Sequence, residues 1–330
     1  MSSLKSKASV LVTGGAGFIG SHLVEALLSV GNDVRVLDNL SSGRLQNLPS
    51  SKSLTFIQGD VRDVGLVETL VQSSEMVFHL AEFIPNTDQY GIGHVTKFST
   101  REPILDFDVS ARGTINVLES ARKADARVIF VSTAAVYGEA PGNPVDEGTP
   151  IRPVSPYGAS KACGELYANT YNRVYGLRTV VARFFNIYGP RQRKYVMYDL
   201  LTRLRDSPSS LTVAGTGQEE RDFMYVKDAV RALLHLSALD NAYGGTFNLG
   251  SGIATSISEL VSLMTRMLNL APRIDYSGVS WKGDIRRLVA DTTRLQKTGF
   301  SCESDLPKGL HALIMRFERS MSETEVLGQE

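Results

Sequence analysis

The sequence predicts an α/β fold in which a doubly wound parallel sheet is followed by a smaller C-terminal α/β region. Short apolar runs alternate with helical patterns through the first half of the 330 residues, and this alternation implies parallel strands joined by right-handed crossovers. A glycine-rich turn closes the first apolar run. After about Arg183 the segments become shorter, and Gly-Pro and Ser-Pro steps separate them.

Each expected strand is a run rich in Val, Ile, Leu or Phe that ends at a polar or glycine-containing turn. We expect strands at 8–13, 33–37, 54–57, 76–80, 127–132 and 179–183. Helical spacing of apolar residues predicts helices at about 18–30, 105–123 and 157–175. A long irregular stretch at 82–100 contains His94, and such stretches often serve as lids or binding loops. The polar residues 319–330 are expected to fray.

Composition excludes several functions. The 35 basic residues balance 35 acidic ones, so a nucleic-acid partner is not expected. Two cysteines, Cys163 and Cys302, are too few for a disulfide framework or a four-ligand zinc site, and we expect no metal. No apolar run reaches the roughly 18 residues of a membrane span, and the N-terminus lacks a secretory pattern. We therefore expect a cytoplasmic protein without a membrane partner.

The chain reads TGGAGFIG at 13–20, where the first strand becomes a helix. Gly14 permits the tight turn, Gly17 lets a pyrophosphate approach the backbone, and Gly20 allows close packing of the helix on the strand. The helix N-terminus supplies N–H groups and partial positive charge for that anion. Asp38, at the end of the second strand, suits the two adenosine ribose hydroxyls and would repel a 2′-phosphate. The sequence therefore favours NAD over NADP.

Further contacts with NAD are expected from the turn and from the ends of the next strands. Asp60 and Val61 follow the third strand and suit the adenine edge, although a helix cap is an equally good interpretation of the pair. The other expected cofactor-binding residues are Phe18, Ile19, Asn39, Gly43, Leu80 and Ala81.

Tyr157 and Lys161 lie four residues apart at the start of an expected helix, so their side chains share one helical face. A phenol has a pKa of about 10, and a nearby ammonium lowers that pKa toward the range of a general base. Thr133 closes the preceding strand at the carboxyl edge of the sheet, where doubly wound folds bind ligands. Its hydroxyl suits the same substrate oxygen, so the three residues form a candidate catalytic set.

In this combination the motifs resemble the NAD-dependent nucleotide-sugar epimerases and dehydratases, which are extended short-chain dehydrogenases/reductases with a Rossmann fold. Within that family the chain is most similar to UDP-glucose (UDP-galactose) 4-epimerases, over about 8–299. The resemblance also rests on HLA at 79–81, GTINVL at 113–118, RFFNIYGP at 183–190, RDF at 221–223, GD at 283–284 and AD at 290–291. We therefore expect residues 1–183 to bind NAD, with 221–250 packing back on them, and 184–330 to bind the nucleotide sugar.

The resemblance implies that Tyr157 removes the 4-hydroxyl proton as C4 gives hydride to NAD. It also implies that Lys161 lowers the tyrosine pKa and binds the nicotinamide ribose, while Thr133 relays or holds the proton. The 4-keto sugar then takes the hydride back on its other face, and NAD is regenerated. Arg221 is implied on the diphosphate, with a surface salt bridge as the alternative. The implied substrate-binding residues, besides Thr133 and Tyr157, are Asn186, Arg193, Arg221, Asp284 and Leu288.

The two residues after Thr133 distinguish the reactions that members of this family catalyse. Dehydratases carry Asp-Glu directly after the threonine, decarboxylases a glutamate and 3,5-epimerases a cysteine, whereas this chain has Ala134 and Ala135. Redox at C4 alone is then implied, with UDP-glucose and UDP-galactose as substrates. Leu288 leaves the N-acetyl pair open. The alternatives are UDP-glucuronate 4-epimerisation, in which Arg193 lies near the sugar carboxylate, a nucleotide-sugar dehydrogenase or ketoreductase, and a non-catalytic NAD-binding protein.

Three positions depart from the family pattern. Ser110 stands where asparagine is usual, Ile84 replaces a cofactor-contacting lysine of some epimerases, and Trp281 replaces an arginine that clamps the diphosphate. The resemblance also implies a homodimer built from the helices at 105–123 and 157–175. Other sources of the charge missing at Trp281 are Lys282, Arg286, Arg191 and Arg193.

Overall fold

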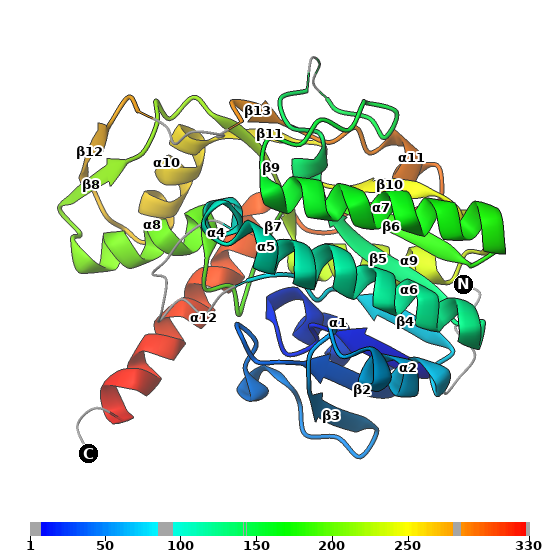
Figure 1. Ribbon diagram of the computed structural model, residues 1–330. Helices are drawn as coiled ribbons and strands as arrows, with labels where there is room; N and C mark the ends of the chain where they lie inside the picture. The colour runs from blue at the N-terminus through cyan, green and yellow to red at the C-terminus, as the bar shows by residue number, and fades with distance from the viewer. Residues whose placement is uncertain (1–7, 85–94, 141, 143, 280–284, 328–330) are drawn as a thin grey trace.

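The computed structural model describes residues 8–84, 95–140, 142, 144–279 and 285–327. A seven-stranded parallel sheet lies between helices on both faces, and a smaller region is built on two short sheets (Figure 1). The strand order in the large sheet is β10-β6-β5-β4-β1-β2-β3. Its strands are β1 (Ser9–Thr13), β2 (Asp33–Asp38), β3 (Leu54–Gln58), β4 (Met76–His79), β5 (Arg127–Thr133), β6 (Thr179–Phe184) and β10 (Thr246–Leu249). The doubly wound fold predicted from the sequence is confirmed.

Helices cover both faces of this sheet, and its central strands are therefore buried. The helix expected at 105–123 is continuous but contains a π-helical turn, η2, between α5 and α6. Ser155 caps α7 by accepting the Gly158 N–H at 3.2 Å. The helices of this part are α1 (Phe18–Ser29), α2 (Val64–Gln72), α4 (Val95–Arg101), α5 (Pro103–Asp106), η2 (Phe107–Arg112), α6 (Gly113–Ala124) and α7 (Pro156–Tyr175), with short 3-10 turns η1 (Leu45–Asn47) and η3 (Ala134–Val136).

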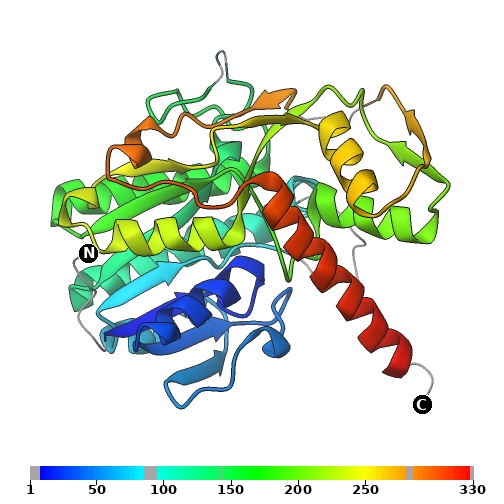
Figure 2. The ribbon, with the colours of Figure 1, turned by 180° about the vertical axis from the view of Figure 1, so that it is seen from behind.

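A later part of the chain returns to the large sheet. Helix α9 (Val226–Ser237) packs against α1, and β10 pairs with β6 at the edge of the sheet (Figure 2). The return begins at Val226 rather than at 221 as predicted. The reason is that β9 (Glu220–Tyr225) pairs with strands of the smaller region instead.

The smaller region consists of the remaining strands and helices. One of its sheets contains β9 with β7, β11 and β13, and the other pairs β8 with β12. Helix α12 continues to Leu327 and includes most of the residues expected to fray. The additional elements are β7 (Asn186–Tyr188), α8 (Tyr195–Asp206), β8 (Ser210–Val213), η4 (Asp240–Ala242), β11 (Ala254–Ser256), α10 (Ile257–Met267), β12 (Arg273–Tyr276), β13 (Arg287–Leu288), α11 (Thr293–Gln296) and α12 (Leu306–Leu327). Among the described helices, none has the length and apolar content needed to cross a membrane.

Close packing of α1 on the glycine-rich turn requires a residue without a side chain. A Cβ at Gly20 would lie 2.2 Å from the carbonyl oxygen of Gly14. We expect Gly20→Ala to lower the free energy of unfolding by about 1–3 kcal/mol, because the backbone must shift to relieve the overlap. Urea unfolding measures the effect. Gly65→Ala is the control, since its Cβ would find its nearest neighbour at 3.7 Å; equal losses in the two variants would contradict the argument.

Candidate active site

A cavity of about 570 Å³ extends from the glycine-rich turn past the ends of β5 and β6 into the smaller region. Most of the predicted site residues line it: Gly14, Gly17, Phe18, Ile19, Gly20, Asp38, Asn39, Asp60, Val61, Leu80, Ala81, Thr133, Tyr157, Asn186, Arg193, Arg221 and Leu288. Two of the predicted residues, Gly43 and Lys161, are not part of this lining. The cavity therefore joins the expected cofactor and substrate sites in one space.

One end of the cavity has the features of an anion site. Gly14 adopts a φ of +71°, which places the chain in the left-handed region at the end of β1. Gly17 is the N-cap of α1, and among the described residues no side chain caps that helix or places an acid in its first turn. Backbone N–H groups and the helix dipole therefore face the cavity, as the pyrophosphate of a dinucleotide requires.

Asp38 lies at the end of β2 beside this turn. Its Oδ2 accepts the Ala16 N–H at 3.0 Å, and its Oδ1 accepts the Leu40 N–H at 2.8 Å. Burial raises the pKa of this carboxyl, and the two backbone hydrogen bonds act against that rise. A Cβ at Gly43 would lie 2.7 Å from Asp38 Oδ1. Gly43 thus leaves room for the carboxylate that the sequence assigns to the adenosine ribose.

Asp60 lies on the same side of the cavity and is held by neighbouring side chains. Arg62 donates from Nε and Nη2 to its two oxygens at 2.9 Å, and Asn39 donates to Oδ2 at 2.9 Å. Burial acts to raise the pKa of Asp60, but the hydrogen bonds from Arg62 outweigh it and lower the pKa to about 2. The N-cap of α2 is Asp63, so the alternative interpretation of Asp60 as the cap of that helix is wrong.

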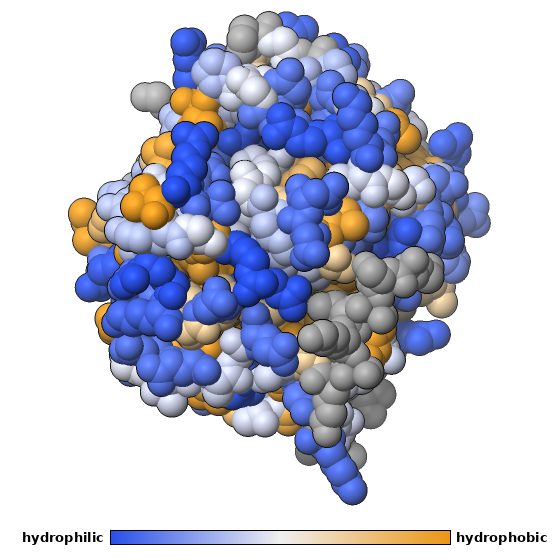
Figure 3. All heavy atoms as spheres, turned by 90° about the vertical axis from the view of Figure 1, so that its right-hand side faces the viewer, coloured by the Kyte–Doolittle hydropathy of each residue, from blue (hydrophilic) through white to orange (hydrophobic). Residues whose placement is uncertain are grey.

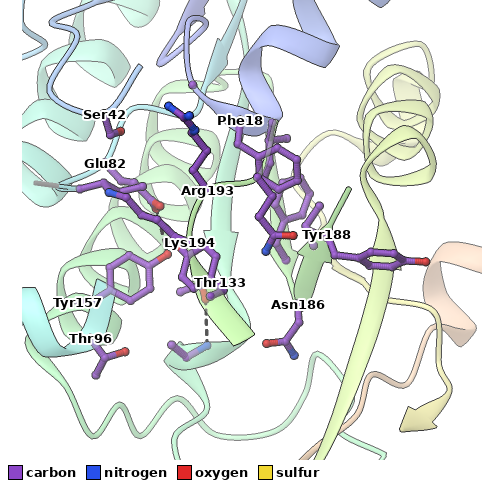
Figure 4. A pocket seen from close by; sticks show the side chains of 18 of the residues that line it. Phe18, Ser42, Glu82, Thr96, Thr133, Tyr157, Asn186, Tyr188, Arg193 and Lys194 are labelled. Carbon is purple, nitrogen blue, oxygen red and sulfur yellow. Dashed lines mark hydrogen bonds between the residues drawn. The ribbon is translucent and has the colours of Figure 1, made fainter. Parts of the chain in front are cut away.

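The reactive end of the cavity contains a carboxylate that the sequence analysis missed. Oε2 of Glu82 accepts a hydrogen bond from the Tyr157 hydroxyl at 2.9 Å and lies 3.1 Å from Lys161 Nζ. Figure 4 shows Glu82 and Tyr157 pointing toward one another across this end of the cavity. Lys161 also donates to the Val131 carbonyl oxygen at 2.9 Å, and its side chain is 1% exposed. The predicted Tyr157/Lys161 pair therefore contains a third ionisable group.

This carboxylate opposes the expected effect of Lys161 on the pKa of Tyr157. The pKa of Tyr157 lies well above its ordinary value, chiefly because of burial and then because of the negative charge of Glu82. The lowered tyrosine pKa that the resemblance implied is therefore not what the structure shows. Glu82 is ion-paired with Lys161 and offsets the charge that would otherwise favour the phenolate.

Thr133 completes the hydrogen-bonded set around Tyr157. Its Oγ1 accepts the Ala135 N–H at 3.2 Å, which begins the 3-10 turn η3. A hydrogen bond between Thr133 and Tyr157 acts to lower the tyrosine pKa, as expected where a hydroxyl donates to the phenol oxygen. Tyr157 therefore interacts with both the Thr133 hydroxyl and the Glu82 carboxylate.

Predicted substrate residues line the opposite wall of the cavity. Asn186 donates from Nδ2 to the Asp222 carbonyl oxygen at 3.2 Å, and Arg221 Nη1 donates to the Glu220 carbonyl oxygen at 2.9 Å. Leu288 is 7% exposed and packs in an apolar cluster with Ala134 and Phe185. These residues come from β7, β9 and β13, so pairing within the smaller sheet places them together.

The basic side chains of residues 191–194 lie in different environments, and two of them interact with different acids, Glu25 and Glu82. Arg191 forms an ion pair with Glu25 on α1. Arg193 is exposed, and in Figure 4 it extends on the Ser42 side of the view. Burial lowers the pKa of Lys194 to about 8, although Glu82 acts to raise it. Lys194, which the sequence analysis did not select, is thus the basic side chain of this stretch that interacts with the reactive end.

Several predicted features lie outside the described residues, namely His94, Trp281, Lys282 and Asp284. Ile84, which replaces the lysine of some epimerases, lines the cavity. Arg286, an alternative to Trp281, is exposed. Within the described part of the chain, no group of three or more His, Cys, Asp or Glu has the arrangement of a metal site.

A sequence signal for Glu82 existed. It directly follows HLA at 79–81, at the carboxyl end of β4, which pairs with the strand that carries Thr133. Ligands of doubly wound sheets bind at this edge, so an acid three residues beyond such a strand is a candidate functional group. An acid absent at Ala134 and Ala135 is thus present after the neighbouring strand β4.

Comparison with known proteins shows what the chain resembles. The family model described as the NAD dependent epimerase/dehydratase family matches residues 10–250. The UDP-glucose 4-epimerase of Mycolicibacterium smegmatis is 33% identical over 323 residues, which cover 95% of this chain and 99% of that protein. The UDP-N-acetylglucosamine 4-epimerase from Methanobrevibacter ruminantium, solved in complex with UDP-N-acetylmuramic acid, has a TM-score of 0.87 and 32% identity, covering 96% of this chain and 100% of that chain. The UDP-glucose 4-epimerase from Thermotoga maritima, solved with UDP-glucose, has a TM-score of 0.85 and 32% identity, covering 95% of this chain and 99% of that chain.

Proposed function

The chain belongs to the NAD-dependent epimerase/dehydratase family, and we propose that it interconverts UDP-hexoses at C4. The pair UDP-glucose and UDP-galactose is the proposed substrate, and the N-acetyl pair is an alternative. One observation carries the proposal: the Tyr157 and Thr133 hydroxyls lie in the same cavity as the dinucleotide cradle at Gly17, while Ala134 and Ala135 follow Thr133. The relatives named as UDP-sugar 4-epimerases support it over most of the chain.

The residues present fit NAD. The glycine turn and the N-terminus of α1 suit the pyrophosphate, and Asp38 suits the adenosine ribose. When bound, NAD supplies a reversible hydride acceptor for C4 of the sugar. We propose that Thr133 and Tyr157 hold the sugar 4-oxygen and that Tyr157 exchanges its proton. Lys161 is proposed to contact the nicotinamide ribose.

The smaller region is proposed to hold the nucleotide diphosphate. Arg221 suits a phosphate because its guanidinium donates several N–H groups in one plane, and it lines the cavity. Asn186 is proposed beside the diphosphate or sugar, and Asp284 at the nucleotide ribose. Anchoring through UDP leaves the hexose free to turn over beside Tyr157, as inversion at C4 requires. Leu288 is proposed to limit the size of the 2-substituent.

Proton NMR of the purified protein with individual UDP-sugars tests the proposal. UDP-glucose, UDP-galactose, their N-acetyl counterparts and UDP-glucuronate are supplied separately, without added cofactor and then with NAD. We expect one pair to reach a stable mixture of two epimers. Unchanged sugars in every sample would overturn the proposal, and net formation of reduced cofactor would favour a dehydrogenase. Conversion of UDP-glucuronate alone would favour the uronate reaction.

We also propose that the protein is a homodimer that pairs through the face of α7. This helix exposes large apolar side chains at Leu166 (61%) and Val174 (64%), and Phe107 on the adjacent η2 is 49% exposed. By contrast, the face at the right-hand side of Figure 1 carries mostly hydrophilic side chains, with apolar groups in small separate patches (Figure 3). Apolar surface gathered on one helix face is typical of a protein interface.

Charge placed on this face should separate the subunits. We expect the double variant Leu166→Glu, Val174→Glu to sediment as a monomer where the unaltered protein sediments as a dimer. Val64→Glu on α2, which replaces a side chain that is 55% exposed, should leave the mass unchanged. A dimer that persists in the α7 variant would place the interface elsewhere.

A cytoplasmic location is proposed as well. Cys163 and Cys302 are both free thiols, and unpaired cysteines are usual where the cell keeps thiols reduced. Fluorescence microscopy of the tagged full-length chain tests this expectation.

A further inference from the structure

The strongest feature that the proposed function does not use is the carboxylate of Glu82. Its Oε2 atom contacts both Tyr157 Oη at 2.9 Å and Lys161 Nζ at 3.1 Å. The tyrosine can only donate in this contact, because an ionised carboxylate only accepts. The hydrogen bond therefore defines a path along which the Tyr157 proton can leave, and that path leads away from the substrate oxygen.

The surrounding backbone fixes Glu82 in this position. The N–H of Phe83 donates to Ser110 Oγ at 3.0 Å, and the Phe83 side chain is 7% exposed within the apolar core. Ser110 lies in the π-helical turn η2, and its hydroxyl in turn donates to Asp106 Oδ1 at 3.4 Å. Ser110, where the family usually has asparagine, thus supports the segment that carries Glu82. These contacts make the Glu82–Tyr157 contact a built feature of the fold.

Charged and titratable groups face Glu82 from several elements. Lys161 on α7 forms an ion pair with it, and Lys194 before α8 attracts it electrostatically. Asp106 on α5 and Tyr195 on α8 interact with it so that their own pKa values rise. Two cations, one acid and one phenol thus face this carboxylate besides Tyr157. A proton that moves to Glu82 neutralises its carboxylate, and Lys161 then keeps its hydrogen bond to the Val131 carbonyl oxygen.

We propose that Glu82 is the proton acceptor behind Tyr157 in the C4 redox step, an inference that rests on the proposed function. As hydride leaves C4 and the C4–O bond becomes a carbonyl, the 4-hydroxyl proton moves to Tyr157 Oη and the tyrosine's own proton moves to Glu82 Oε2. When hydride returns to the opposite face, Glu82 returns its proton to Tyr157, which protonates O4. Protons and electrons balance over the cycle. Glu82 acts through Tyr157, and Thr133 holds the shared oxygen.

This arrangement explains how Tyr157 can work although the phenolate is disfavoured. Burial and the Glu82 charge raise the pKa of Tyr157, and the tyrosine hydroxyl donates to Glu82 at 2.9 Å. A tyrosine that passes one proton on as it receives another never needs to ionise fully. The second acid/base group that is missing after Thr133 is thereby supplied from the end of β4.

Glu82→Gln tests the proposal, because glutamine retains the size and an acceptor oxygen but takes up no proton. We expect the epimerisation kcat at pH 7 to fall about 10²-fold and to rise as much as about tenfold per pH unit above that, since hydroxide then ionises Tyr157. The unaltered enzyme should show a flat profile over the same range. The control is Glu68→Gln on α2, whose carboxylate pairs with Lys123 outside the cavity.

A second variant separates chemistry from shape. Glu82→Ala leaves space for a small carboxylate, and we expect added formate, but not chloride at equal ionic strength, to restore at least about tenfold of the lost kcat. A Glu82→Gln enzyme as fast as the unaltered one at pH 7 would overturn the proposal. A loss of rate that is independent of pH and not rescued by formate would also overturn it, since this is the result of a purely structural role.

A measurement without substrate keeps the two proposals distinguishable. Tyrosine labelled with ¹³C at Cζ reports ionisation by NMR, and the Tyr157 signal is assigned by its absence in Tyr157→Phe. We expect Tyr157 to ionise at lower pH in Glu82→Gln than in the unaltered protein, because a negative charge is removed while Lys161 stays. An unshifted titration would overturn the link between Glu82 and Tyr157. If the unaltered protein converts no UDP-hexose, the proposed function fails and the proton path falls with it, whatever the titration shows.

Discussion

Tyr157→Phe is expected to lower the kcat of UDP-hexose epimerisation by about 10²–10⁴-fold, the usual contribution of a positioned proton-transfer group. The phenol O–H donates to Glu82, and the phenol also interacts with Thr133, so removal of the hydroxyl breaks both contacts. The epimer ratio measured by proton NMR over time gives the rate. Protein-bound NAD should be retained, because the glycine turn and Asp38 are unchanged.

Tyr167→Phe is the matched control. Tyr167 lies on the same helix α7 but is 41% exposed and is absent from the cavity lining. Its loss should leave kcat unchanged within about twofold. Epimerisation by Tyr157→Phe at near the original rate would contradict the assignment of the proton-transfer residue and, with it, the enzyme interpretation of the site.

Arg183→Met is expected to cost about 3–5 kcal/mol of unfolding free energy, the usual loss when one partner of a buried ion pair is removed. Arg183 Nη2 lies 2.6 Å from Glu165 Oε2, with the two side chains 5% and 0% exposed. Its Nη1 also donates to the Tyr137 hydroxyl at 2.8 Å. Methionine fills much of the space but leaves the Glu165 charge in the core without its guanidinium. Urea unfolding monitored by circular dichroism measures the loss.

Arg273→Met provides the comparison for this loss. Arg273 pairs with Asp275 at 2.8 Å, but the side chains are 79% and 49% exposed. Exposed pairs of this kind contribute about 0–1 kcal/mol. If both variants lost stability equally, general effects of removing an arginine would explain the result better than burial of the Glu165 pair.

Much of the fold could be predicted because its signals are local. Each of the six expected strands is an apolar run of a few residues, and each is found within one residue of its expected bounds. The turn around Gly14 and the four-residue spacing of Tyr157 and Lys161 are equally local. These features are predictable because they depend only on residues that are close together in the sequence.

The site residues that the sequence did not predict, Glu82 and Lys194, lie in irregular segments outside the strands. Their positions depend on the path of the backbone in those segments. Glu82 contacts Tyr157 because the N–H of Phe83 donates to Ser110 in the π-helical turn η2. The periodicity of apolar residues does not predict a π-helical turn. The backbone path also determines why Lys194, and not the predicted Arg193, interacts with Glu82. Arg191 and Tyr195, on either side, adopt positive φ values of 70° and 72°, which side chains of their size rarely favour. The backbone of this turn therefore orients Lys194 toward Glu82, and apolar periodicity does not predict such a turn.

The return of β10 to the large sheet affects how the chain is made. Strand β6 ends at Phe184, but its partner β10 begins only at Thr246. A ribosome that adds about 5–20 residues per second needs roughly three to twelve seconds for the chain between them. During that interval the edge of β6 is open to pairing with other nascent chains. The late arrival of one short strand thus makes the synthesis of residues 246–249, rather than completion of the first 183 residues, the earliest point at which the large sheet can be completed.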